Sequence, residues 1–313
     1  MNRAFSVGAG LLADRLLGEP PPRLHPLPWF GRAVSWLERV EYRDDVAAGV
    51  LHCVAGTTLA AGAGTILSSV GTATYLAVGG NSLLAAARDI AQALERGEPE
   101  RARRMLPSLV GRDPSMLDEK EMARAVVESV AENTNDAVVA PVVWAISAGA
   151  PGALWYRAVN TLDAMVGSRS ERYERFGRAS ARMDDFAGWV PARVTAALVA
   201  LVRPRSAVEV LRVTRTDAPA HPSPNAGVCE GAFAAALGLR LGGENRYGDR
   251  LELRPPLGIG RAPEVADIER AVRLSRDVSS ALAVILALLG ALSVLRTASS
   301  RRARERRCPG SRT

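Results

Sequence analysis

Residues 126–193 read VVESVAENTNDAVVAPVVWAISAGAPGALWYRAVNTLDAMVGSRSERYERFGRASARMDDFAGWVPAR, which sets carboxylates, amides and arginines directly against apolar stretches. Polar and ionisable groups beside segments long enough to enter a bilayer are costly unless they are paired or face a water-filled cavity. Their density in this stretch therefore calls for a functional explanation. The stretch predicts a helical membrane protein with a polar site, and hence an enzyme candidate.

The composition favours a single helical membrane domain. Of the 313 residues, 48% are hydrophobic and only 5% are aromatic. Alanine, glycine, leucine and valine dominate, a mixture that allows close helix packing and membrane insertion. We expect residues 1–295 to form one membrane-embedded, all-α domain, a polytopic integral membrane protein with several spans, broken or re-entrant helices and polar cytoplasmic loops.

Uncharged stretches mark the expected spans. Residues 46–87 contain no Asp, Glu, Lys or Arg, which is enough for two spans of about 20 residues or for one span and a buried helix. A helical hairpin is the simplest interpretation. Residues 278–295, VSSALAVILALLGALSVL, form the clearest single span. Residues 137–156 and 186–202 contain helix breakers, and we expect broken helices there that line a protein cavity.

The net charge of +7 is concentrated in the tail, residues 296–313, whose seven arginines and one glutamate give +6. A basic cluster that directly follows an apolar run is typical of the positive-inside signal. We expect a disordered cytoplasmic tail on a multi-pass protein of the cell (inner) membrane, with the active site facing the cytoplasm. No base-reading motif supports binding to nucleic acid.

Several common site motifs are missing from the sequence. The three cysteines and three histidines are scattered, so neither a disulfide framework nor a zinc site is predicted. There is no G-x-x-x-x-G-K-[ST] motif, so a nucleotide site would need a design other than the P-loop.

Three carboxylates share one stripe of the expected helix over residues 121–136. Glu128, Glu132 and Asp136 are spaced at i, i+4 and i+8, with Asn133 beside them. A hydrated Mg²⁺ that bridges carboxylates and substrate phosphates would offset their mutual repulsion. The alternative is a solvated helix face, and the apolar run that follows favours a site.

Further polar side chains flank the two imperfect spans. Arg157, Asn160 and Asp163 follow the first, where they would orient a phosphate or carboxylate, although Asn160 would also serve as a helix cap. Arg178 and Arg182 precede the second at i and i+4, close to Asp184 and Asp185. Phosphate binding and an ordinary Arg–Asp ion pair are equally good interpretations of that group. Two loop regions complete the candidates: ADRLLGEPPPRLHP supplies Asp14 and His25, and HPSPNAGVCEG supplies Asn225 and Glu230.

Long motifs of this chain resemble the CobD/CbiB family of cobalamin biosynthesis, the adenosylcobinamide-phosphate synthases. The motifs are DRLLGEPPPRLHP, ESVAENTNDAVVAP, YRAVNTLDAMVG, ERYERFGRASARMDD, VPARVTA and SPNAGVCEGAFAAALGLRLGGENRYG. They occur in order from about Asp14 to about Gly248. Their combination is far more specific than any single pattern described above.

The resemblance implies an integral membrane enzyme that forms an amide between adenosylcobyric acid and aminopropanol phosphate, or a related amino alcohol. The product is adenosylcobinamide phosphate, and ATP and Mg²⁺ are the implied cofactors. The expected partners are the corrinoid and amino-alcohol phosphate substrates, membrane lipid and other cobalamin-assembly enzymes. A corrinoid transporter or a corrinoid-binding membrane scaffold is the alternative, because broken helices with buried charges are also typical of transporters.

Roles within such an enzyme are assigned as hypotheses. The expected metal ligands are Glu128, Glu132 and Asp136. The candidates for catalysis are Glu128, Glu132, Asp163, Asp184 and Asp185, any of the last three being able to accept the amine proton. The expected substrate and phosphate contacts are Asp14, His25, Asn133, Arg157, Asn160, Arg178, Arg182, Asn225 and Glu230.

Overall fold

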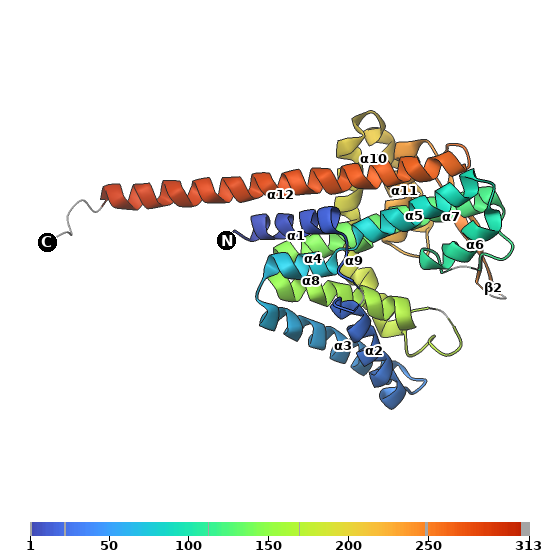
Figure 1. The fold of residues 1–313 in the computed structure, drawn as a ribbon, viewed down its shortest axis with the longest axis horizontal. Coiled ribbons are helices and arrows are strands. Elements are labelled where there is room, and N and C mark those ends of the chain that lie inside the picture. The colour runs from blue at the N-terminus through green and yellow to red at the C-terminus, as the bar shows by residue number, and fades with distance from the viewer. Residues whose placement is uncertain (1, 22, 112, 169, 248–249, 308–313) are drawn as a thin grey trace.

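Helices make up most of the computed structural model, which describes residues 2–21, 23–111, 113–168, 170–247 and 250–307 (Figure 1). The longer helices are α1 (Arg3–Leu17), α2 (Pro26–Glu41), α3 (Val46–Leu67), α5 (Gly80–Glu95), α7 (Glu119–Thr134), α8 (Ala140–Val166), α9 (Arg178–Val202), α10 (Ala207–Thr216), α11 (Ala226–Leu237) and α12 (Val265–Arg307). The short elements are α4 (Val70–Ala77), α6 (Pro99–Met105), η1 (Leu106–Ser108), η2 (Asn135–Val139), η3 (Pro204–Ser206) and η4 (Ala218–Ala220).

In the part of the chain that the structure describes, four helical stretches are long and apolar enough to cross a membrane: Val46–Leu67, Glu119–Val166, Arg178–Val202 and Val265–Arg296. The first and last lie where the sequence predicted spans. Of the two interpretations of residues 46–87, one span followed by a further helix fits the structure and two spans do not, because only α3 is long enough. Ser68 adopts a left-handed conformation (φ 57°) that ends α3, and α4 then has eight residues against the roughly 20 that a span needs.

The helix over residues 137–156 is broken at Gly149, whose φ of 71° and ψ of −151° suit glycine. The chain reverses there. The rings of Trp144 and Trp155 lie 4.6 Å apart, and the Tyr156 hydroxyl donates to Asp136 over 3.3 Å. A straight helix would separate residues 136 and 156 by about 30 Å. The reversal therefore brings the polar residues before the apolar stretch next to those that follow it.

The second imperfect stretch has the opposite outcome, since α9 is one continuous helix through Pro191. The break expected in residues 186–202 does not occur. Proline has no N–H to donate to the carbonyl four residues earlier, which is that of Ala187. The Trp144 indole N–H donates to this carbonyl over 3.0 Å and replaces the missing bond. The first arm of the α8 hairpin thus supports the neighbouring helix.

A β-hairpin departs from the all-α prediction. Strands β1 (Leu241–Tyr247) and β2 (Arg250–Leu257) pair antiparallel, in a region where the sequence showed only loop signals. Leu241 and Leu257 are buried opposite each other in the register, and a bulge follows at Gly242 (φ 87°). Arg124 of α7 donates to the Glu244 carbonyl over 2.7 Å. The hairpin is therefore fixed against the helix that carries the acidic stripe.

Helix α12 extends the fold beyond its core. It continues to Arg307, so residues 296–307 are helical and the expected disorder of the tail is wrong for them; residues 308–313 lie outside the described part of the chain. Helix α1 runs antiparallel to α12, because Asn2 bonds the Gly290 carbonyl at 3.3 Å and Arg15 bonds Ser280 at 2.6 Å. In Figure 1 the C-terminal part of α12 projects past the other helices.

Candidate active site

An acidic cavity of about 510 Å³ lies where α7, α8, α9, the loop before α11 and strand β2 meet. Its walls carry six carboxylates and one guanidinium among its lining residues. The acidic residues are Glu132, Asp136, Asp163, Asp184, Asp185 and Glu252, and the basic one is Arg254. Because like charges this close repel, the cavity strongly favours a bound cation or a ligand that carries one.

Asp136 reaches the cavity from an irregular turn of helix. Residues Asn135–Val139 form a π-helix between α7 and α8, and such wide turns often occur at functional sites. The Asn135 amide donates to the Asp136 carboxylate at 2.8 Å, and Thr195 of α9 in turn donates to the Asn135 side-chain carbonyl at 3.2 Å. The turn therefore aims Asp136 and fixes it with partners from α8 and α9.

Asn160 connects carboxylates from two different helices. Its amide lies 3.4 Å from the Asp136 carboxylate and 3.4 Å from that of Asp184. Both acids are 24 residues away in sequence, one on each side. The Gly149 reversal and the packing of α9 on α8 thus bring three predicted site residues into one cluster.

Two other cavity carboxylates are less constrained. Within the described residues, neither Glu132 nor Asp163 makes a hydrogen bond or ion pair through its side chain. Asp163 lies near the end of α8, and a side chain at Gly167 would collide with its carboxylate. These two acids are therefore free to bind a cation or to accept a proton.

The predicted phosphate-binding arginines occupy different environments. Arg178 and Arg182 are exposed on the first turns of α9 and have no ion-pair partner in the described part of the chain. Ala181, Asp184 and Asp185 of the same helix line the cavity. The two guanidinium groups are thus available near the acids, which leaves phosphate binding open and does not support the Arg–Asp ion pair.

Arg157 lies behind the cavity, not along its wall. A Cβ added at Gly79 would be 2.6 Å from the Glu19 carboxylate and 4.0 Å from the Arg157 guanidinium. The Nε of Arg157 is buried and has no hydrogen-bond partner within the described residues. The guanidinium interacts electrostatically with Glu19 of the N-terminal loop and with Asp136 of the acidic cluster, so it lies between the two.

Glu128 does not join the predicted metal ligands in the cavity. Its carboxylate accepts the Gly242 N–H at 3.0 Å and lies 3.9 Å from the guanidinium of Arg124. The hairpin that packs across this turn of α7 therefore engages Glu128, whereas Glu132 and Asp136 line the cavity. Asn133 also lies outside it, because its amide donates to the Ser129 carbonyl of its own helix at 3.0 Å.

The other two loop candidates border the cavity without lining it. Asn225 donates to the Asp185 carbonyl at 2.9 Å, so it positions α9 against the loop before α11. Glu230 is fully buried, with Oε1 3.6 Å from Arg254 and 3.9 Å from His221. Both residues therefore support the side chains that do line the wall.

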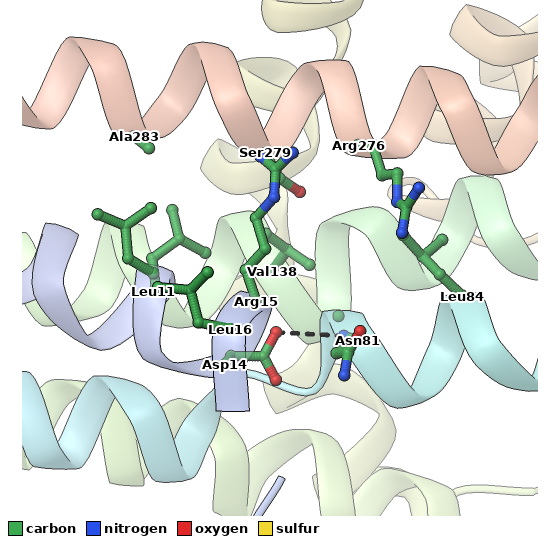
Figure 2. A pocket seen from close by; sticks show the side chains of 12 residues that line it. Leu11, Asp14, Arg15, Leu16, Asn81, Leu84, Val138, Arg276, Ser279 and Ala283 are labelled. Carbon is green, nitrogen blue, oxygen red and sulfur yellow. Dashed lines mark hydrogen bonds between the residues drawn. The ribbon is translucent and has the colours of Figure 1, made fainter. Parts of the chain in front are cut away.

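Asp14 occupies a separate pocket between α1, α5 and α12, shown in Figure 2. Its carboxylate accepts the Asn81 N–H at 3.1 Å. Burial, with a smaller contribution from the nearby Glu19 carboxylate, raises the pKa of Asp14 to about 6. His25 caps α2 by accepting the Leu27 N–H at 3.1 Å, and burial lowers its pKa. Neither residue lines the acidic cavity.

Sequence reasoning missed three ionisable residues among those that line the cavity: His221, Glu252 and Arg254. His221 accepts the Ser223 N–H at 3.1 Å through Nδ1, and burial lowers its pKa, so the imidazole is neutral near pH 7. Its loop, HPSPNAG, carries the prolines, asparagine and glycine that are typical of turns, and this signal could have pointed to the histidine. Glu252 and Arg254 left no comparable signal, because they reach the cavity only through the unexpected hairpin.

The donor atoms of the cavity suit a hard cation such as Mg²⁺, since nearly all are carboxylate or hydroxyl oxygens. Within the described residues, no three His, Cys, Asp or Glu side chains are grouped closely enough to hold a metal ion by themselves. A Mg²⁺ ion bound here would therefore need oxygen ligands from water or from a substrate phosphate.

The family model described as CobD/Cbib protein matches residues 7–275, which include every residue of the cavity wall. The chain belongs to the CobD/CbiB family. A cobalamin biosynthesis protein CobD from Mycobacterium tuberculosis (strain ATCC 25618 / H37Rv) is 49% identical over 301 residues, covering 92% of this chain and 96% of the relative. CobD of Chromobacterium violaceum is 45% identical over 291 residues, with coverages of 88% and 92%.

A more distant CobD/CbiB relative, CobD of Rhodobacter capsulatus, is 37% identical over 313 residues and covers 93% of this chain and 99% of its own length. No solved structure matches the chain. The relatives thus extend over nearly the whole protein, and the arrangement of the acidic cavity comes from the present structure.

Proposed function

We propose that this CobD/CbiB family member is a membrane enzyme of cobalamin biosynthesis that forms adenosylcobinamide phosphate. It would join the amino group of aminopropanol phosphate, or of a related amino alcohol, to the free propionate of adenosylcobyric acid. The observation that carries the proposal is the convergence of cavity carboxylates from α7, α8 and α9 in a chain of this family. Such a cavity suits a substrate with an ammonium group and a Mg²⁺-bound phosphate.

Amide formation from a carboxylate needs activation, because an oxide is a very poor leaving group. ATP and Mg²⁺ would supply it by transfer of the terminal phosphoryl group to the propionate oxygen, with the metal neutralising phosphate charge. The amine nitrogen then attacks the acyl carbon, the C–O bond to phosphate breaks, and the nitrogen loses a proton.

We assign that proton to Asp163, because its carboxylate lines the cavity and has no partner among the described residues. Asp136 and Asp184 are less suited, since Asn160 already donates to both. Glu132 and Asp136 would face the metal, with substrate phosphate oxygens completing its ligands. Arg178 and Arg182 would hold phosphate groups through their free guanidinium N–H donors.

The hairpin of α8 supports a proposal for the membrane arrangement. Its turn at Gly149 lies within the apolar stretch, while Asp136 before it and Asp163 after it line the same cavity. We propose that the hairpin is re-entrant, so that both polar ends lie on the cytoplasmic side of the inner membrane. Irregular backbone at membrane depth is tolerated where protein surrounds it.

The decisive test is reconstitution of the purified protein in lipid with adenosylcobyric acid, ATP, Mg²⁺ and aminopropanol phosphate. Mass spectrometry should find the amide product, and omission of any one component should abolish it. The Glu132→Gln variant should insert normally and lose turnover. Corrinoid flux into vesicles without amide product or ATP consumption would favour a transporter and refute the synthase.

A further inference from the structure

Helix α2 (Pro26–Glu41) carries large apolar side chains on its outward face as well as on the face that packs against the protein, unlike an ordinary amphipathic helix of a soluble protein. Usually the apolar face packs on the core and the polar face meets solvent. In α2 only Val34 is buried, while its tryptophans are exposed. The helix therefore presents an apolar surface outwards that the described part of the protein does not cover.

The inner face of α2 packs Val34 against the protein, with Leu27, Phe30 and Leu37 half-buried beside it, and hydrogen bonds of Glu38 hold it in place. Glu38 accepts hydrogen bonds from Arg172 at 3.0 Å and from the Tyr173 hydroxyl at 2.9 Å. Tyr42, just after the helix, donates to the Arg172 carbonyl at 2.9 Å. Glu38 thus attaches α2 to the segment between α8 and α9, whose first residues, Gly167, Ser168 and Ser170, line the acidic cavity.

The outer face of α2 is apolar and aromatic. Trp29, Trp36 and Val40 are 60%, 64% and 66% exposed, and their spacing of seven and four residues places them on one stripe. By the same helical spacing, this stripe lies opposite Val34 and Glu38. Three large apolar side chains on one exposed stripe form a contact surface.

Two arginines border the apolar stripe along one edge. Arg32 lies over the Trp29 ring with its guanidinium carbon 4.5 Å from the ring centroid. Arg32 and Arg39 are both exposed and have no ion-pair partner within the described residues. An apolar stripe with tryptophan, edged by free guanidinium groups, matches a bilayer surface whose headgroups are anionic.

The position of α2 also points to lipid. It ends at Glu41, and α3, a stretch long and apolar enough to span, begins at Val46. In Figure 1, α2 lies beside α3 and is inclined to the direction in which α1 and α12 run. A helix just before the start of a span lies at the membrane–water boundary, where tryptophan is enriched.

We propose that α2 lies in the membrane–water interface with Trp29 and Trp36 among the lipid headgroups, and that Glu38 thereby holds the segment lining the acidic cavity at the membrane surface. The occupant of the apolar stripe is the bilayer itself. A second copy of the chain on this stripe would contradict the proposal. Neither the lipid contact nor the Glu38 link requires the proposed catalytic reaction.

Depth-dependent quenching of tryptophan fluorescence tests the lipid contact. The full chain is placed in vesicles that contain anionic lipid and phospholipids brominated either near the glycerol or near the chain end. Replacement of both tryptophans, Trp29→Phe with Trp36→Phe, should remove most of the quenching by the shallow bromines. Trp189→Phe is the matched control, because Trp189 is 52% exposed on α9 and should leave the shallow signal of α2 intact.

Unchanged shallow quenching in the double variant would overturn the proposal. So would a dimer that dissociates on replacing Trp29 and Trp36 and shows no quenching of these residues. Phenylalanine keeps the helix apolar, so the variants should fold, and circular dichroism checks this before the comparison.

Hydrogen exchange tests the link from lipid to cavity. In nanodiscs, anionic lipid should slow exchange of backbone amides in residues 170–177 relative to neutral lipid. The Glu38→Gln variant should lose this lipid dependence while keeping the shallow tryptophan quenching. Equal exchange in both lipids for the unmodified protein would overturn the link. These readouts need no substrate, so they fail or succeed independently of the proposed synthase activity.

Discussion

Two apolar stretches with helix breakers behave in opposite ways in this protein. Residues 137–156 reverse direction at Gly149, whereas α9 passes through Pro191 without interruption. The two stretches differ in how the backbone is accommodated at the helix breaker. The Ala187 carbonyl, which Pro191 leaves without its helical donor, receives the Trp144 indole N–H, while the backbone at Gly149 takes a conformation that only glycine readily adopts.

Among the predictions, replacement of Gly149 should have the largest effect on stability and activity, because the chain reversal depends on this residue. In the Gly149→Val variant, a β-branched residue would be forced to a φ of 71° and a ψ of −151°, which costs at least about 1–3 kcal/mol in backbone strain. Misplacement of the hairpin would separate Asp136 from Asp163. We expect loss of the folded fraction in detergent and loss of activity. Gly62→Ala is the control, because nothing lies near a Cβ at that position of α3.

A Gly149→Val protein with unchanged thermal stability and activity would mean that the reversal does not depend on glycine. Since Gly152 and Gly64 also pack closely at this turn, their substitution would then be the next test of what fixes the hairpin.

The cavity depends on both stretches, because Asp136 lies at the start of the hairpin and Asp184 lies on α9. The Asp184→Asn variant should keep the Asn160 contact and lose one cavity charge. We expect turnover to fall by about 10²-fold or more, in line with removal of a charged group from an active site. Product formation by mass spectrometry measures it. Glu100→Gln, an exposed carboxylate on α6, should retain full activity.

The sequence predicts the unbroken apolar helices better than it predicts the two stretches with helix breakers. The apolar runs of α3 and α12 predict spans from composition alone, because length and hydropathy decide them. The outcome at Pro191 depends on Trp144, a residue 47 positions earlier in the numbering, and no local pattern reports such a contact. Breakers in a sequence therefore locate weak points in a helix, and tertiary partners decide whether the helix breaks.

The candidate site shows the same limit. The stripe of Glu128, Glu132 and Asp136 was visible from helical spacing, and two of its members line the cavity. Glu128 was misplaced because β1 supplies the Gly242 N–H from a distant part of the chain. Arg254 and Glu252 entered the cavity through the same hairpin, which the sequence showed only as a loop. The chemistry of the side chains was enough to infer that distant segments meet at one site. Only the structure shows which residues line that site.

A double-mutant cycle on Trp144 and Pro191 tests the compensation directly. Trp144→Phe removes the donor to the Ala187 carbonyl and should cost about 1–3 kcal/mol, the typical penalty for a buried unsatisfied acceptor. In a Pro191→Ala background the restored N–H should bond this carbonyl, so the same substitution should cost less. Thermal unfolding in detergent gives both values. Additive effects would show that the indole does not replace the helical bond.

The smallest expected effect is on stability and comes from Asp14, which lies behind the start of the hairpin. A Cβ added at Gly80 would lie 2.8 Å from Val138 and 3.4 Å from the Asp14 carboxylate, so Asp14 lies just behind the η2 turn that leads into the hairpin. The pKa of Asp14 is raised from 3.8 to about 6. A carboxyl group with a raised folded-state pKa stabilises the fold below its unfolded-state pKa, and this stability is lost as the pH rises towards the folded-state value.

The Asp14→Asn variant should therefore be more stable than the unmodified protein above about pH 6, by roughly 1–2 kcal/mol, and the advantage should vanish near pH 4. Its side-chain carbonyl still accepts the Asn81 N–H. Thermal unfolding in detergent between pH 4.5 and 8 measures the difference between the two proteins. A difference that does not change with pH would mean that ionisation of Asp14 costs the folded protein no stability.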